Sequence, residues 1–353
     1  MPPANVPSPL ALLGVYQAPY ADPPRRRRRM RSPLPLAIVF AALIGVIGTR
    51  GVLRAADDRT DDIERVEGLE AVLAADDGPS ENYLLVGSDT REGADPSDPD
   101  FGGIGDTNEV SGHRSDTIMI LRRDEDGGAA LVSLPRDLWL PIAGTGGSNR
   151  INSAYTDGPE RLAATITQSL GIPIHHFVEV DFQGFKEIVD KIGGVDLCIE
   201  HATRDLHTGL ALQPGCQTLD GVQALAFARS RYYEEFRDGD WVTDGSADLG
   251  RIKRQQLFMR AAVNGAINEI RSSPFGSGKL IDAVTSAVRI DAQLDPIKAG
   301  ESLRRAAEEN LTTFTLPVSG VDVNGNAVLE LDDTAQPILD YFRGVGPQPE
   351  PAA

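Results

Sequence analysis

From Asn82 onward, short apolar runs alternate with helical hydrophobic patterns, and this alternation constrains the possible fold more than any other feature of the chain. Apolar runs of four to eight residues between turn residues are typical of buried strands, whereas apolar positions three and four apart are typical of helices. Their alternation predicts an α/β domain. Strands are expected at residues 83–87, 117–122, 129–134, 177–180, 195–199 and 312–316.

The helical patterns lie between these runs and after them. The predicted helices cover residues 159–170, 185–192, 221–228 and 249–270, with further helical patterns at 279–288 and 296–309. A chain of 353 residues with 41% hydrophobic residues can bury one sizeable core. We therefore expect one folded domain, over residues 82–345, with other segments before and after it.

A charge-free apolar segment at residues 33–49 follows an arginine-rich run, Arg25 to Arg31. At about 17 residues it is close to the shortest helix that crosses the hydrocarbon of a bilayer. Basic residues before such a helix favour a cytoplasmic N-terminus. A cleaved signal peptide is the alternative, but the segment is longer than a usual signal core and no A-x-A site follows it directly.

These features predict a membrane protein with five segments. Residues 1–32 form a disordered cytoplasmic tail, 33–50 a transmembrane anchor, 51–81 a stalk, 82–345 the folded domain and 346–353 a disordered tail. The expected location is the cell membrane, with a single span and the domain outside the cytoplasm.

The charge distribution argues against nucleic acid as a partner. The formal net charge is −18, although residues 1–32 hold six arginines against the single Asp22, so the acidity lies in the rest of the chain. Binding to nucleic acid depends on a surface that neutralises many phosphates. The arginine run could be a nucleic-acid or localisation patch, but the apolar segment behind it favours a membrane anchor.

Cys198 and Cys216 are the only cysteines of the chain, and both follow the predicted anchor. A compartment outside the cytoplasm allows disulfides to persist. A bridge between them would close a loop of about 19 residues and restrict the unfolded chain by roughly 3 kcal/mol. Two separate buried thiols are the alternative, and neither cysteine has a partner at zinc-ligand spacing.

Arginine and aspartate occur together in five segments at the ends of predicted elements. These are Gly87-Ser88-Asp89-Thr90-Arg91, Arg114-Ser115-Asp116-Thr117, Pro135-Arg136-Asp137, Arg229-Ser230-Arg231 and the run from Asp248 to Gln255. Guanidinium groups match phosphate oxygens, and paired aspartates can hold Mg2+ against the same oxygens. Each pair alone is more often a solvated salt bridge, but five together predict a diphosphate site.

Two of these segments suggest how their side chains are arranged. Helical spacing puts Asp248, Arg251 and Gln255 on one face of the long helix. In an extended segment, Arg229 and Arg231 would share one side.

Eight sequence strings carry a resemblance to a known family. In order along residues 82–260 they are NYLLVGSDTR, RSDTIMIL, LVSLPRDLWLPI, RINSAY, HHFVEVDFQGF, IGGVDLCIE, LDGVQALAFARSR and DLGRIKRQQ. As an ordered set they resemble the LytR-CpsA-Psr proteins of bacterial cell envelopes. Two segments depart from the simplest pattern of that family, residues 92–113 and 232–247.

The resemblance implies a three-layer α/β/α sandwich around a central mixed sheet. It further implies an enzyme that transfers a glycan polymer from a polyprenyl-pyrophosphate carrier to peptidoglycan by phosphodiester formation, with the lipid leaving as polyprenyl pyrophosphate. The cysteine pair and the arginine-rich tail resemble actinobacterial members, for which the glycan is arabinogalactan. The partners are then the lipid-linked glycan donor, the peptidoglycan acceptor and the membrane.

The resemblance also assigns roles to individual residues. The catalytic residues would be Asp89, Arg114, Arg136, Arg229 and Arg231, the Mg2+ ligands Asp89 and Asp116, and further substrate-binding residues Arg91, Asp248, Arg251 and Gln255. Two alternatives use the same cluster differently. One is a phosphatase that cleaves the polyprenyl pyrophosphate with water, and the other a non-catalytic envelope scaffold or lipid-binding regulator.

Overall fold

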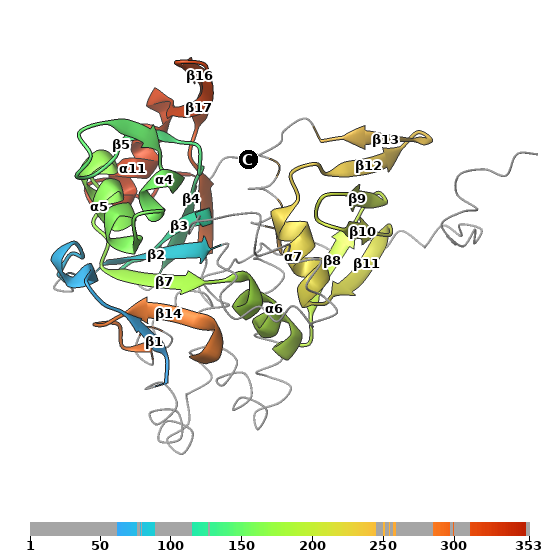
Figure 1. The fold of residues 1–353 in the computed structure, drawn as a ribbon, viewed down its shortest axis with the longest axis horizontal. Helices are drawn as coiled ribbons and strands as arrows, with labels where there is room; N and C mark the ends of the chain where they lie inside the picture. The colour runs from blue at the N-terminus through green and yellow to red at the C-terminus, as the bar shows by residue number, and fades with distance from the viewer. Residues whose placement is uncertain are drawn as a thin grey trace, which may run out of the picture. The chain divides into compact units, whose positions relative to one another are not determined.

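A seven-stranded mixed sheet forms the centre of the structure, a computed structural model (Figure 1). The structure describes residues 62–75, 78, 80–88, 115–125, 128–244, 250, 254, 257–258, 285–296, 299 and 311–350, without the side chains of Asp116 and Leu311. The strand order is β1-β14-β7-β2-β3-β4-β15. The strands are β1 (Glu64–Val66), β2 (Glu81–Ser88), β3 (Ser115–Arg123), β4 (Ala129–Leu134), β7 (His176–Val180), β14 (Val288–Asp291) and β15 (Leu311–Thr315).

Both strand directions occur within this sheet. The pairs β1/β14, β7/β2 and β4/β15 are parallel, whereas β14/β7, β2/β3 and β3/β4 are antiparallel. The predicted α/β class with a central mixed sheet is therefore confirmed.

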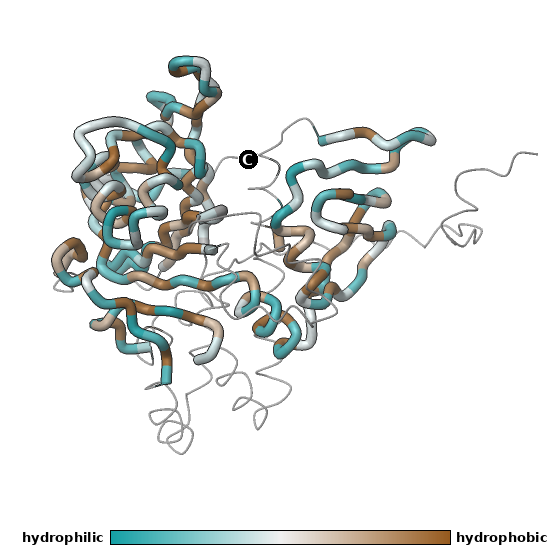
Figure 2. Tube along the Cα trace, in the orientation of Figure 1, coloured by the Kyte–Doolittle hydropathy of each residue, from teal (hydrophilic) through white to brown (hydrophobic). Residues whose placement is uncertain are grey.

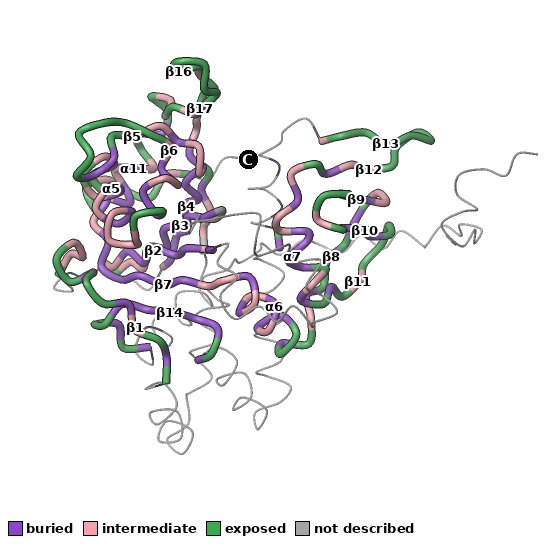
Figure 3. The backbone as a smooth tube through the Cα atoms, in the orientation of Figure 1, coloured by how far each residue is buried: buried purple, intermediate pink, exposed green. Residues whose placement is uncertain are grey.

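Each face of the sheet is covered by a separate hydrophobic core. Alternate side chains of β2 point to opposite faces, as strand geometry requires. Tyr83 and Leu85 join one core with α6 (Phe182–Lys191) and α7 (Gly221–Arg229). Leu84 and Val86 join the other with α4 (Asn152–Tyr155), α5 (Pro159–Leu170) and α11 (Gln336–Phe342). Burial of successive residues along β2, visible in Figure 3, explains why the run from Tyr83 to Val86 is apolar without interruption.

The helices next to the site begin and end on recognisable signals. Pro159 opens α5, and Gly171 ends it in the left-handed conformation with φ 71°. The Asp181 side chain caps α6, whose hydrophobic and hydrophilic residues alternate around the helix (Figure 2). A capping box of Asp220 and Gln223 opens α7.

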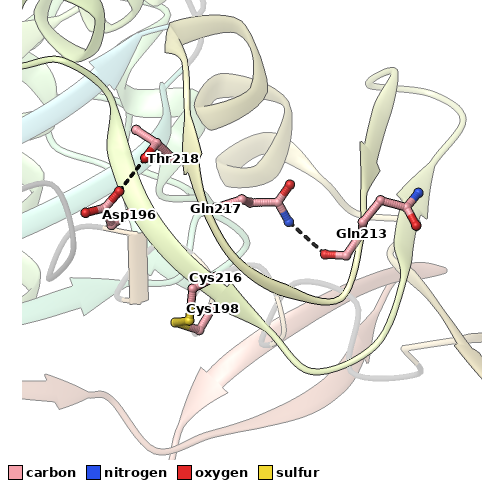
Figure 4. The surroundings of a disulfide bond; sticks show 6 residues. All are labelled: Asp196, Cys198, Gln213, Cys216, Gln217 and Thr218. Carbon is pink, nitrogen blue, oxygen red and sulfur yellow. Dashed lines mark hydrogen bonds between the residues drawn. A yellow bond between two sulfur atoms is a disulfide. The ribbon is translucent and has the colours of Figure 1, made fainter. Parts of the chain in front are cut away.

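A disulfide joins Cys198 to Cys216 across two antiparallel strands, β8 (Val195–Ile199) and β11 (Gly215–Leu219). The two residues are paired directly in the register, on the exposed face of the hairpin (Figure 4). On the same face the Thr218 hydroxyl donates to Asp196 at 2.6 Å. The bridge expected from the sequence is therefore present, between exposed residues rather than in the core.

Smaller sheets complete the fold. A four-stranded sheet contains β9 (Thr203–Asp205), β10 (Leu210–Leu212), β12 (Glu234–Arg237) and β13 (Asp240–Thr243), so the segment 232–247 contributes a hairpin. Two further hairpins are β5 (Trp139–Pro141) with β6 (Ser148–Arg150), and β16 (Val318–Val323) with β17 (Asn326–Leu331). Short 3-10 helices lie at η2 (Leu69–Ala71) and η3 (Asp333–Ala335).

The structure corrects two predictions made for segments near the sheet. The stalk was predicted to extend over residues 51–81, but the folded domain already includes part of this range. The strand β1 belongs to the central sheet, and Leu69 is fully buried in a core. The helical pattern expected up to residue 288 was wrong at its end, because Val288 begins β14. The strands β1 and β14 are short and contain charged residues, so their sequences have little strand character of their own. They form because they pair with neighbouring strands of the sheet.

Several predicted elements lie outside the described residues. They include the apolar segment 33–49, the insertion 92–113 and most of the helix expected at 249–270, where the described positions 250, 254, 257 and 258 are helical. Within the described part of the chain, no helix has the length and apolar character needed to cross a membrane.

Buried Asp291 fastens β14 to its neighbours. Its side chain is fully buried and accepts hydrogen bonds from the Phe177 amide at 2.9 Å and from the amides of Gln293 and Leu294, both at 2.9 Å. The His176 ring lies 3.3 Å away. Burial by itself would raise the pKa of Asp291, but the His176 side chain and these amides lower it below its ordinary value.

We predict that Asp291→Ala lowers the free energy of unfolding by about 3 kcal/mol, because it leaves several buried donors without an acceptor. The stabilisation is present at neutral pH and is lost as the pH falls through the lowered pKa of the native carboxyl, hence below about pH 4. Urea denaturation against pH measures both effects. Asp157→Ala on the surface is the control, with an expected change within about 0.5 kcal/mol; equal losses for both variants would contradict the prediction.

Candidate functional site

A cavity of about 610 Å³ brings two of the predicted site arginines together, although they are far apart in the sequence. Arg136 follows β4, and Arg231 follows α7. The residues lining the cavity are Arg136, Asp137, Asn149, Arg150, Asn152, Ser153, Thr156, Arg231 and Ala327. Three arginines against one aspartate leave two positive charges in excess, so the cavity is locally cationic in a chain of net charge −18. Such a cavity suits an anionic ligand.

Asp137 lies between two of these arginines. Its carboxylate is 3.5 Å from Arg136 Nε and 3.2 Å from Arg150 Nε, and all three side chains are partly exposed. The Asp137 carbonyl also accepts the Leu329 amide at 3.0 Å, and Arg150 donates to the Ala327 carbonyl at 2.9 Å. The hairpin β16–β17 thereby holds this wall of the cavity in place.

The cavity is also lined by neutral polar side chains, which can form hydrogen bonds without carrying a charge. Asn149 belongs to β6, Asn152 and Ser153 begin α4, and Thr156 follows that helix. The Ser153 hydroxyl donates to the Arg150 carbonyl at 2.7 Å. Amide and hydroxyl groups both donate and accept hydrogen bonds, which is what sugar hydroxyls require. The cavity therefore combines cationic groups that can bind an anion with neutral groups that can bind a carbohydrate.

Arg229 does not share this cavity with Arg231. It is the last residue of α7, and its guanidinium carbon lies 4.2 Å from the ring centroid of Phe182. Ser230 then leaves the helix with φ −57° and ψ 127°, and the chain continues to Arg231. The prediction that the two arginines share one side of an extended segment was therefore wrong, because the helix continues through Arg229.

Asp116, one of the two predicted Mg2+ ligands, lies near the start of β3. Gly87 pairs with Thr117 and Ser88 with Ser115, so the backbone of Asp116 occupies an irregularity in the ladder. Asp89 follows Ser88 directly in the sequence but lies outside the described residues. Two carboxylates are the hard oxygen ligands that Mg2+ prefers, so the donor types fit. Among the residues with described positions, no cluster of three or more candidate metal ligands is present.

The other predicted site residues cannot be placed in this cavity. Those outside the described part of the chain are Asp89, Arg91, Arg114, Asp248, Arg251 and Gln255. Their roles stay predictions.

Sequence reasoning missed a buried polar network beside the end of β2. The Tyr155 hydroxyl lies near the side chains of Glu179 and Ser88. Burial, together with the Glu179 carboxylate, raises the pKa of this tyrosine. Glu179 also accepts from Arg289 Nη1 at 3.0 Å and is only 1% exposed. The one charged residue within the apolar run 177–180 was the available signal.

Comparison with known proteins agrees with this architecture. The profile of the LytR_cpsA_psr family matches residues 50–338, which is most of the chain. The chain belongs to the LytR_cpsA_psr family. A solved relative, "LytR-Csp2A-Psr enzyme from Actinomyces oris", superposes with a TM-score of 0.63 at 26% identity, over 79% of this chain and 95% of that one.

Two relatives show how this family member compares in sequence. "Probable cell wall biosynthesis protein LcpB" of Corynebacterium glutamicum is 33% identical over 73% of this chain, and the match spans 59% of that protein's length. "Polyisoprenyl-teichoic acid--peptidoglycan teichoic acid transferase TagU" of Oceanobacillus iheyensis is 30% identical over 69% of each protein. The chain thus covers well under two thirds of the corynebacterial relative.

We predict that Arg136→Ala and Arg231→Ala each weaken binding of inorganic pyrophosphate by the full-length protein about tenfold or more, because each removes charge-assisted hydrogen bonds. Lysine at either position should restore only part of the affinity, since it lacks the planar fork of arginine. Isothermal titration calorimetry measures the change. Arg161→Ala, on the exposed side of α5, is the matched control; unchanged affinity in both site variants would contradict the assignment.

Proposed function

We propose that this protein transfers a glycan polymer from a polyprenyl-pyrophosphate carrier to peptidoglycan, forming a phosphodiester bond. The observation that carries the proposal is the cavity that Arg136 and Arg231 line together with neutral amide and hydroxyl side chains. That combination suits a ligand with both phosphate and sugar groups. Membership in the family supports it, and so does the relative TagU, whose name gives a teichoic acid transferase acting on peptidoglycan.

The atom balance of this reaction fixes the leaving group. An acceptor hydroxyl oxygen attacks the phosphorus bonded to the glycan, and the bond from that phosphorus to the oxygen bridging the two phosphates breaks. The phosphodiester keeps one phosphate, so the lipid leaves as polyprenyl monophosphate rather than the pyrophosphate implied by the resemblance. The hydroxyl proton passes to a base, for which Asp89 is the candidate by resemblance.

The described residues would bind and orient the donor. Guanidinium groups of Arg136 and Arg231 would neutralise the phosphate oxygens, and Asn149, Asn152 and Thr156 would bind the neighbouring sugar. Fixing both ends of the ligand holds the reacting phosphorus in one place. Mg2+ held by Asp89 and Asp116 would supply further positive charge against the phosphates.

The finer features of the proposal rest on sequence and on relatives. We place the protein in the cell membrane, with residues 1–32 in the cytoplasm and the domain outside, because a polyprenyl donor lies in the bilayer. Arabinogalactan is the proposed glycan, supported by likeness to a corynebacterial protein named for cell wall biosynthesis. The disulfide between Cys198 and Cys216 fits a compartment outside the cytoplasm.

The direct test reconstitutes the full-length protein in vesicles with lipid-linked arabinogalactan precursor, peptidoglycan and Mg2+. We expect peptidoglycan carrying the glycan through a phosphodiester, detected by mass spectrometry after wall digestion. Arg136→Ala should slow the transfer about a hundredfold, by analogy with the loss of one charge-stabilising donor in an active site. Arg161→Ala is the control and should transfer at the normal rate.

The other outcomes would contradict the proposal in different ways. Free glycan phosphate with no attachment to peptidoglycan would identify a phosphatase that uses water. Donor binding with no covalent product, under conditions in which a related transferase works, would identify a lipid-binding scaffold or regulator.

A further inference from the structure

Asp205, at the end of β9, is a fully buried carboxylate to which the proposed transfer assigns no part. Its Oδ2 accepts three hydrogen bonds, from the Ser230 hydroxyl at 2.7 Å and from the amides of Arg231 and Tyr232, both at 3.0 Å. Its Oδ1 accepts the His207 amide at 2.8 Å. One buried anion therefore holds three consecutive residues of the segment that carries Arg231 to the cavity.

Arg254 holds the same segment through a different atom. Its Nη2 donates to the Ser230 carbonyl at 2.8 Å, and its Nη1 donates to Asp244 at 2.8 Å. The guanidinium carbon lies 4.3 Å from the ring centroid of Tyr233, and the residue is only 7% exposed. Ser230 is thus fixed through its hydroxyl by Asp205 and through its carbonyl by Arg254.

The ionised form of Asp205 is favoured by its surroundings. Burial alone would raise the pKa of this carboxyl, but the Ser230 hydroxyl and the amides of His207, Tyr232 and Arg231 lower it below its ordinary value. Hydrogen bonds to an ionised acceptor are about twice as strong as neutral ones. The carboxylate is therefore a strong fixed point for the chain that leaves α7.

Besides the His207 amide in its own loop, the donors to the Asp205 side chain belong to the segment just after the C-terminal end of α7. The start of that helix has its own anchors, because Asp220 accepts the Gln223 amide at 2.8 Å and Asp190 accepts the Gly221 amide at 2.7 Å. Loss of Asp205 would therefore leave α7 attached at its start and the Ser230 carbonyl held by Arg254, while the Ser230 hydroxyl and the amides of Arg231 and Tyr232 lose their acceptor. Arg231 is the residue of that segment that lines the cavity.

We propose that Asp205 is a positioning residue, which fixes the backbone from Ser230 to Tyr232 and so holds the Arg231 guanidinium where the ligand phosphate binds. The inference rests on the phosphate site of the proposed function. A residue that merely stabilises the domain would affect ligand binding whether or not Arg231 is present. Asp205, by contrast, acts on the ligand through Arg231. A shift of about 1 Å in a binding group can reduce activity about a hundredfold.

A double-mutant cycle on the full-length protein tests this pathway, with inorganic pyrophosphate as the probe and calorimetry as the measurement. Asp205→Asn replaces one acceptor oxygen by a donor and should weaken binding about tenfold. Combined with Arg231→Ala, it should weaken binding no more than about twofold beyond Arg231→Ala alone, because there is no guanidinium left to position. Independent, multiplying losses would overturn the proposal.

Two further variants keep the test decisive. Asp196→Asn removes an exposed carboxylate of β8 that also accepts a side-chain hydroxyl, and it should bind pyrophosphate as the unaltered protein does. Ser230→Ala removes one donor to Asp205 and leaves the two amides, so it covers the case in which Asp205→Asn does not fold. It should weaken binding about threefold, and only when Arg231 is present; a loss that persists with Arg231→Ala would overturn the proposal.

The outcomes also separate this inference from the proposed function. Non-additive binding losses in a protein that transfers no glycan would leave the positioning role intact and contradict the transfer. An unaltered protein that binds no pyrophosphate would contradict both.

Discussion

Burial of the central sheet on both faces is the constraint on which the rest of this structure depends. Strands such as β2 and β4 have hydrophobic side chains on each side, and only two separate cores can remove both sets from water. The chain must therefore place helices or other segments against each face. Functional groups are then left to the strand and helix ends, where Arg136 follows β4 and Arg231 follows α7.

Buried carboxylates secure these ends in a repeated manner. The Asp291 carboxylate accepts hydrogen bonds that tie β14 to β7, Glu179 accepts one from Arg289, and Asp205 accepts three from the segment after α7. Each charge is met by hydrogen bonds or an ion pair, which is the condition under which a buried ion does not destabilise the fold. Some of the acidity of the chain is thus structural, while the cavity with Arg136 and Arg231 is locally positive.

Much of the fold could be predicted because its central elements have strong local patterns. The strands at residues 129–134 and 195–199 and the helix at 159–170 coincide with β4, β8 and α5. By contrast, β1 and β14 have three and four residues with charges among them, and they form because each pairs with a distant strand. No local pattern contains that information.

The candidate site was predictable in composition but not in geometry. The sequence indicated Arg136, Arg229 and Arg231 together, yet only the fold shows that the first and last share a cavity while Arg229 lies on Phe182. Asn149, Thr156 and Asp205 are single polar residues that belong to no recognisable motif, so the sequence did not predict a role for them. Their significance depends on the neighbours that the tertiary structure gives them.

A crystal structure of the protein with a bound prenyl-pyrophosphate-linked sugar would test the central claim most directly. The account predicts phosphate oxygens within hydrogen-bond distance of both Arg136 and Arg231, and the sugar in contact with Asn149, Asn152 and Thr156. A ligand bound elsewhere, with Arg136 still paired to Asp137 and no phosphate near Arg231, would contradict it.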